Sequence, residues 1–369
     1  MTKAYMSKKK YTNPNNYTFE LRAKPLIVVF LFILFYSCKS GKERPDISNI
    51  QIDLKVHRFE QQLFSIDSAA PKPGLKQLIK KYPDFAPLFV SNVLGLGPIT
   101  DSNRIIESGI RRFIHLSTPV YDRSEKIYRN FKSIDKELKI AFRYLKYYYP
   151  SYPIPEIYTT IGPLDALPPL SNGEPSPNFM GPGFLAIGLQ FYLGADEPLY
   201  SDEVFSTNIV PTYRSRRFSK EYIAADVMKL VLDDIYPDSS RRLPLGEQFI
   251  ERGKRLYILG SLLPDAHDTI LIGYTSKQLE WCQKNEREIY NFFLQQNLLF
   301  ERDLARIMPF ISDGPYTQGM PENSPGNIGA FLGWQMVKSY HEKMKTISIQ
   351  QLMKVPAADI IRDSGYKPR

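Results

Sequence analysis

The sequence is poor in the side chains that build cross-links and metal sites. Its 369 residues include two cysteines, Cys38 and Cys282, and four histidines. Two cysteines cannot form the disulfide framework that staples small secreted folds. No two histidines stand four residues apart, so the HExxH type of zinc helix is absent. The chain also lacks CxxC, P-loop, GxGxxG and GxSxG motifs, which leaves redox, nucleotide and ordinary serine-hydrolase chemistry without support.

Charge of one sign is not in large excess once its distribution is considered. The chain has 48 Lys and Arg against 39 Asp and Glu, a net charge of +9. Residues 1–37 hold six basic residues and one acidic residue, so the rest of the chain carries only +4. That surplus is ordinary for a globular domain, and we predict no nucleic-acid partner. A composition of 43% hydrophobic and 13% aromatic residues excludes a coiled coil, a collagen-like fibre and a disordered chain.

Long apolar runs are also scarce, and the clearest one lies near the N-terminus. Residues 26–36 are eleven apolar or aromatic residues that follow Pro25 and a basic stretch. A bilayer span needs about 20 such residues, so this run fits the hydrophobic core of a secretory signal better. Ser37 and Cys38 come next, as in a bacterial lipoprotein signal. We therefore predict a lipoprotein signal peptide over residues 1–37 and lipidation of Cys38 by a diacylglycerol carrying acyl chains such as palmitate.

An alternative stays open for this segment. Phe35 and Tyr36 are bulkier than the residues usual before a lipidated cysteine, which would suit an uncleaved N-terminal anchor. Translation could begin at Met1 or at Met6.

After the signal, residues 38–50 are polar and predict a tether, and residues 51–369 predict one large domain. If Cys38 is acylated, Cys282 has no partner within the chain, and we expect it to be a small buried apolar group.

The residue pattern beyond the tether predicts a mostly helical α+β domain with a small sheet. Strands are expected from alternating or buried apolar runs at 51–59, 156–161 and 184–193. Helices are expected from apolar residues at steps of three and four and from capping residues, at 124–149, after Ser219 as far as Pro237, at 246–259, from Thr275 to about 294, and from Ser324 to 343. The last helix carries Gly326, Gly329 and Gly333 on one side. We predict that another backbone approaches there, with Trp334 and Val337 beside the contact, because glycine otherwise destabilises a helix by about 1 kcal/mol.

Few residues suggest catalysis. His267, between Asp265 and Asp268, is the best single candidate for a metal ligand, but a solvated loop histidine explains it more simply. The neighbouring carboxylates Asp233 and Asp234 point apart on a helix and are expected to be solvated. We predict no cofactor and no metal.

Several separated segments, in the right order, resemble the gliding motility lipoprotein GldB family of the Bacteroidetes. They are Asn178-Phe-Met-Gly181, residues 189–194, Gly253-Lys-Arg-Leu-Tyr257, Gly273-Tyr274 with Gln278, Trp281 and Asn285-Glu286, residues 324–335, and Tyr366-Lys-Pro368. The resemblance implies a cell-envelope lipoprotein needed for gliding and linked to type IX secretion, held to a membrane by its lipid, with the periplasmic side favoured over the cell surface. The resemblance provides no enzymatic activity that could be assigned to this chain.

A fainter likeness connects the chain with a family of predicted zinc-dependent proteases. In that scheme the helix at 220–234 would hold the metal motif, but it contains no histidine. Asp226 alone cannot supply the three protein ligands of a catalytic zinc. A zincin-like scaffold would therefore be degenerate and could survive as a peptide-binding cleft. We predict an interaction groove formed by Phe179, Met180, Tyr222, Asp226 and Trp334.

Three functions remain as hypotheses. The first is a non-enzymatic, lipid-anchored protein that binds other gliding or secretion proteins of the envelope. The second is an exported hydrolase or metalloprotease-like enzyme with an unrecognised site, which could use His267 and nearby carboxylates. The third is a structural envelope protein that stabilises a neighbour.

Overall fold

The structure is a computed structural model that describes residues 44–99 and 104–368. The predicted signal peptide and Cys38 lie outside these residues.

The strands are β1 (Val56–Arg58), β2 (Glu156–Thr160), β3 (Asn178–Gly181) and β4 (Phe184–Gly188). The helices are α2 (Phe59–Phe64), α3 (Pro71–Lys81), α4 (Ala86–Leu88), α5 (Arg104–Tyr128), α6 (Lys132–Tyr148), α7 (Pro198–Ser201), α8 (Glu203–Asn208), α9 (Thr212–Ser215), α10 (Ile223–Ile235), α11 (Leu245–Leu262), α12 (Asp268–Ile272), α13 (Ser276–Lys284), α14 (Glu286–Gln295), α15 (Leu304–Ile311), α16 (Ile328–Lys343), α17 (Ile349–Lys354) and α18 (Ala357–Asp363). The predicted mostly helical α+β class with a small sheet is confirmed.

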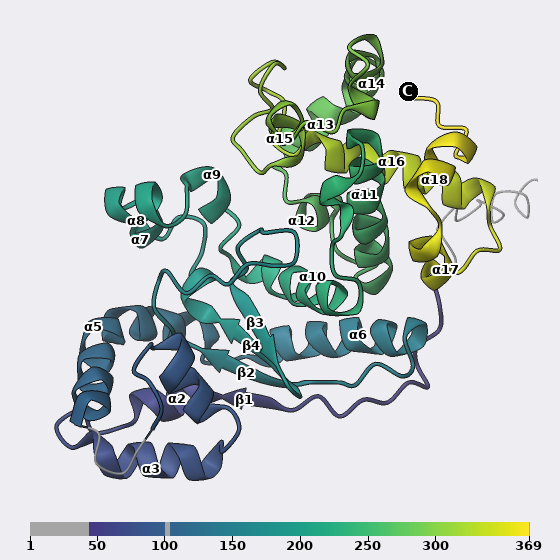
Figure 1. The fold of residues 1–369 in the computed structure, drawn as a ribbon. Coiled ribbons are helices and arrows are strands. Elements are labelled where there is room, and N and C mark those ends of the chain that lie inside the picture. The colour runs from purple at the N-terminus through teal and green to yellow at the C-terminus, as the bar shows by residue number, and fades with distance from the viewer. Residues whose placement is uncertain (1–43, 100–103, 369) are drawn as a thin grey trace, which may run out of the picture. The chain divides into compact units, whose positions relative to one another are not determined.

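The sheet has the strand order β1-β2-β4-β3 and separates two groups of helices (Figure 1). β1, β2 and β4 are parallel, and β3 returns antiparallel to β4. Side chains alternate between the two faces, as a strand requires. Ile157 and Leu185, which are paired in register, join the core shared with α6, α10 and α11. Tyr158 and Phe184 join a second core with helices α2 to α5.

The C-terminal helices form a third core away from the sheet. It contains Leu245 and Phe249 of α11 with apolar residues of α13, α14, α15 and α16. In this core α11 and α16 pack closely, as the glycine pattern predicted. A side chain on Gly253 would overlap the backbone of Gly333, and one on Gly333 would overlap the carbonyl group of Phe249. Trp334, one of the residues expected beside the contact, is buried.

The predicted long helix at 124–149 is wrong, because the chain breaks it in two. α5 ends at Tyr128 and α6 begins at Lys132. Between them the Asn130 side chain accepts a hydrogen bond from the Lys132 backbone N–H at 3.1 Å, which competes with helical bonding. Phe131 turns inward beneath the guanidinium group of Arg58, 5.3 Å from its ring centroid. Ser124, the expected N-cap, is buried inside α5.

Other predicted boundaries were wrong as well. The strand expected at 51–59 is formed only by β1, since α2 begins at Phe59. The apolar run at 184–193 leaves the sheet after Gly188 and continues as a 3₁₀ turn. The predicted capping box of Thr275 and Gln278 is confirmed, but its helix α13 ends at Lys284 and α14 begins at Glu286.

The expected Ser324 cap is also wrong. α16 begins at Ile328, and its N-cap is Asn327, which has a φ of 54°. Ser324 instead accepts a hydrogen bond from the backbone N–H of Thr317 at 3.2 Å. The side chain thus closes the loop before the helix rather than the helix itself.

Candidate functional site

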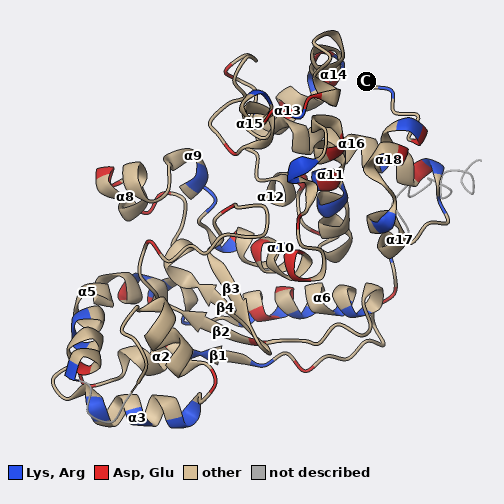
Figure 2. Cartoon of the chain, in the orientation of Figure 1, with Lys and Arg blue, Asp and Glu red and all other residues tan. Residues whose placement is uncertain are grey.

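A cavity of about 130 Å³ opens where six separated segments meet. They are the loop at 170–174, the residues after α9, parts of α10, α11 and α12, and the segment 313–330 that leads into α16. Figure 2 shows basic residues at α9 and on α11 and acidic residues on α10. The charged lining consists of five cations and three acids, namely Arg216, Arg217, Lys229, Arg252, Arg255, Glu174, Asp233 and Asp313.

Helix α11 supplies one continuous wall of the cavity. Arg252, Arg255, Leu256 and Leu259 line it, at positions i, i+3, i+4 and i+7 that share one face of a helix. The wall therefore changes from cationic to apolar over roughly 10 Å of helix. The wall is fixed in place because α11 packs through Gly253 against α16.

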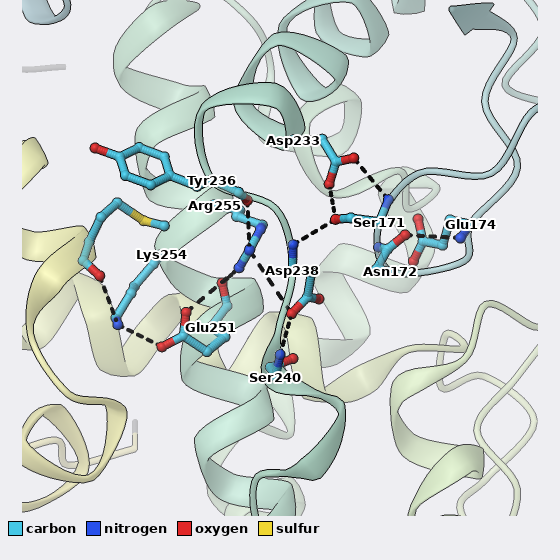
Figure 3. Close-up of polar contacts among 11 residues, drawn as sticks. Ser171, Asn172, Glu174, Asp233, Tyr236, Asp238, Ser240, Glu251, Lys254 and Arg255 are labelled. Atoms are coloured by element: carbon cyan, nitrogen blue, oxygen red, sulfur yellow. Dashed lines mark hydrogen bonds and ion pairs between the residues drawn. The ribbon is translucent and has the colours of Figure 1, made fainter.

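Arg255 is held by the structure around it (Figure 3). Its Nη2 donates to the Tyr236 carbonyl at 2.9 Å, and its Nη1 donates to the Glu251 carbonyl at 3.1 Å. The Asp238 carboxylate lies 4.0 Å from Nη2 and accepts the Ser240 backbone N–H at 2.7 Å. Burial raises the pKa of Asp238, but Arg255 and Ser240 lower it by more, so the net pKa lies below the ordinary value.

Hydrogen bonds to the end of α10 fix the loop that forms another wall (Figure 3). Asp233 accepts both the backbone N–H of Ser171, at 2.8 Å, and its hydroxyl group. The Ser171 hydroxyl in turn accepts the Asp238 N–H at 2.6 Å. Asp234 accepts the hydroxyl of Tyr152 at 2.9 Å. Asp234 is exposed and Asp233 is half-buried at the end of α10, as expected for a solvated helix end, but both carboxylates also anchor other segments.

The arginines that follow α9 differ in their partners. Arg217 pairs with Asp313, and Arg214 lies 3.8 Å from the same carboxylate. Burial lowers the pKa of Arg217, but Asp313 raises it by more. Arg216 donates to the carbonyl of Gly273 at 2.6 Å, and burial together with Arg217 lowers its pKa. The positive charge of Arg217 is thus compensated, whereas Arg216 donates to neutral oxygens, the Gly273 carbonyl and, at 3.5 Å, the Gln278 side chain.

Arg252 is the least compensated of the cations. Its Nη2 lies 3.5 Å from the Ile311 carbonyl, at the limit for a hydrogen bond, and its Nε and Nη1 are buried without a partner among the described residues. Burial lowers its pKa, although Glu174 acts in the opposite direction. Within the described part of the chain, the Nε of Arg255 and the Oδ1 of Asn327 are also buried and unpaired. Buried polar groups are normally satisfied, so these atoms mark a site with unused hydrogen-bonding capacity.

The five residues of the predicted groove have different surroundings. Phe179 packs with the core of α2 to α5, while Met180, Tyr222 and Trp334 belong to or pack against the core of α6, α10 and α11. Trp334 is only 3% exposed. The Asp226 carboxylate accepts a tyrosine hydroxyl at 3.3 Å and lies 3.2 Å from a lysine ammonium group. The groove itself stays a prediction.

The other candidate residues have structural roles. His267 is the N-cap of α12, and its Nδ1 lies 2.8 Å from the Thr269 hydroxyl. Among the described residues, no three His, Cys, Asp or Glu side chains gather as a metal site would require. Cys282 is buried as predicted, and burial raises the pKa of its thiol.

Sequence reasoning missed the arginines of the cavity. Two patterns in the sequence could have indicated them: the run Arg214-Ser-Arg-Arg217, and Arg252 with Arg255 three residues apart just before the apolar residues 256–259. Neither pattern shows that the segments meet, because that depends on how α10, α11 and α12 pack.

One family model matches nearly all of the described chain. The model, whose description is gliding motility protein GldB, matches residues 40–368. The chain belongs to the GldB family. Neither a curated protein nor a solved structure matches it.

The cavity of this GldB-family protein is lined by segments that carried the resemblance. Gly273, Tyr274 and Gln278 contribute from one side, and Pro325 and Asn327 from another. The Tyr274 hydroxyl donates to the Asn327 carbonyl at 2.9 Å and so joins two of these segments. Considering only the described residues, none of the GldB chain's helices has the length and apolar character of a membrane span.

Proposed function

We propose that this chain is a lipid-anchored envelope protein of the gliding apparatus, linked to type IX secretion, that acts by binding other proteins of that apparatus. Membership of the GldB family supports the role in gliding. The family match begins at residue 40, just after the predicted lipidation site Cys38, which fits a domain that follows an anchor. Ser37-Cys38 after an apolar run supports attachment through lipid, with the periplasmic side favoured.

The observation that carries the binding role is a group of exposed apolar side chains on helix α15 and just before it. Ile307, Phe310 and Ile311 of α15 are buried in the third core. Leu304 and Met308 of the same helix are 38% and 48% exposed.

Phe300, just before α15, extends the exposed apolar surface and is 75% exposed. Apolar side chains gathered on a surface are typical of protein contacts. We infer that an apolar surface of another gliding protein covers this face.

Replacing the exposed residues tests the proposal. A Leu304→Gln, Met308→Gln double variant should abolish gliding and reduce crosslinking to a partner through Phe300, while its thermal unfolding midpoint stays unchanged. The matched control is Leu116→Gln on α5, which changes a more exposed apolar residue, at 62%, elsewhere on the chain. Normal gliding by the double variant would refute the binding role of this face.

The anchor and the alternative function need separate measurements. A Cys38→Ala variant should lose metabolic labelling with palmitate and leave the membrane fraction. Continued labelling would refute lipidation at this residue.

One tightly bound zinc ion per chain in metal analysis would favour the metalloprotease-like alternative instead.

A further inference from the structure

We propose that the arginine-lined cavity binds a small organic anion, with its oxyanion at Arg252 and Arg255 and its apolar body against the leucines of α10, α11 and α12. This site goes beyond the protein contacts proposed above. The exposed side chains of α15 do not line the cavity, so either proposal can fail without the other.

Unused hydrogen-bond donors are the first step of the argument. The Nε and Nη1 of Arg252 and the Nε of Arg255 are buried without partners in the part of the chain that the structure describes. Guanidinium groups match carboxylate and phosphate oxygens in geometry and charge, and such bonds are about twice as strong as neutral ones. An oxyanion would satisfy donors that the described residues leave unpaired.

The balance of charge is the second step. The lining holds five cations and three acids, and acids outside it compensate two of the cations, since Asp226 pairs with Lys229 and both Asp238 and Glu251 lie within 4.0 Å of Arg255. Asp313 is already paired with Arg217, and Asp233 already accepts hydrogen bonds from Ser171. Among the described residues, neither Arg216 nor Arg252 has a carboxylate within 4.0 Å. Buried charge without a partner is unfavourable, so an anionic ligand is the species that this lining stabilises.

The apolar wall is the third step and indicates an organic ligand. Leu232, Leu256, Leu259 and Leu271 line the cavity together with the arginines. A bare inorganic ion would leave this surface in contact with water, whereas an aromatic or aliphatic group would cover it.

The volume of about 130 Å³ is roughly ten times that needed for one water molecule. We therefore expect a ligand of about ten non-hydrogen atoms. An aromatic ring carrying one anionic group has this size.

Titration calorimetry on the purified full chain in detergent tests the site. The probes are phenyl phosphate, benzoate, inorganic phosphate and phenol at constant ionic strength. We expect phenyl phosphate or benzoate to bind at least tenfold more tightly than either inorganic phosphate or phenol. The stronger of the two identifies the head group as phosphate or carboxylate. If neither organic anion binds more tightly than phenol, the proposal is wrong.

A charge-matched pair of variants locates the binding. Arg252→Met should reduce the affinity for the tighter-binding organic anion at least tenfold. Arg129→Met removes the same charge from an exposed position outside the cavity and should leave affinity unchanged. Equal effects of the two substitutions would show that only net charge matters and would overturn the site.

A third variant covers the case in which Arg252→Met does not fold. Leu256→Trp keeps every arginine and fills the apolar half of the cavity, so it should reduce phenyl phosphate or benzoate binding at least tenfold. Unchanged affinity in this variant would place the ligand elsewhere and refute the proposal.

Discussion

The two faces of α11 follow opposite rules of packing. Toward α16, Gly253 and Gly333 bring the backbones together so closely that no side chain fits between them. Toward the cavity, Arg252 and Arg255 of the same helix line the space, and three of their guanidinium nitrogens are buried without a partner among the described residues. The tight face fixes the helix, and this allows the open face to keep groups that would otherwise destabilise the fold. A rigid scaffold carrying unsatisfied polar groups is the arrangement expected of a binding site.

Breaking the tight face should have the largest effect. Gly333→Ala places a methyl group on the carbonyl of Phe249, which is backbone and cannot move aside. We expect the free energy of unfolding to fall by about 3 kcal/mol or more, measured by urea denaturation. Gly260→Ala is the control on α11, since its added carbon would come no closer than 3.3 Å, to the end of the Leu271 side chain. A similar loss in both variants would show that the close approach is not the cause.

On the open face, the same substitution at two neighbouring arginines should change the free energy of unfolding in opposite directions. Arg252→Met removes a buried, unpaired charge and should raise the free energy of unfolding by about 1 kcal/mol. Arg255→Met breaks two bonds to backbone carbonyls, and leaves Asp238 without its cation, so it should lower stability by about 1 kcal/mol. Both are measured by urea denaturation without added anion. A loss of stability in both variants would mean that Arg252 is a structural residue.

The smallest expected effect concerns the carboxylate behind Arg255. Because the folded pKa of Asp238 is lowered, its stabilising contribution is present above the ordinary pKa of 3.8 and is lost as the pH falls through the lower folded value. Asp238→Asn should therefore lower stability at pH 7 by up to about 1 kcal/mol, and the difference from the parent chain should shrink toward pH 3. Asp196→Asn, at an exposed position, is the control and should show no such change. A difference that is the same at both pH values would contradict the ion-pair explanation.

Much of the fold follows from local pattern. β2 was predicted within one residue and α10 within three residues, because their apolar runs are bounded by proline, glycine or serine. The glycines of α16 predicted the helix contact, since only a close neighbour compensates for them. The break at Asn130 was missed because the apolar period continues through Phe131, and a side-chain hydrogen bond decided the outcome instead.

The cavity could not have been predicted in the same way. Arg216, Arg252 and Asp313 are distant in sequence, and nothing in their own segments shows that they meet. Their proximity follows from helix packing, which no periodicity encodes. The segments near Gly273 and Asn327 carried the GldB resemblance, but that resemblance did not indicate that they surround one cavity.

The parallel pairing of the sheet has a consequence for how the chain folds. Val56 pairs with Ile157, about one hundred residues later, and β2 then pairs with β4. Closing such long loops is entropically unfavourable before the contacts form, and topologies of this kind fold slowly. The core of helices α2 to α5 also needs Tyr158 and Phe184 from those later strands. We therefore expect the apolar surface of the N-terminal helices to stay uncovered until β2 and β4 have joined the sheet.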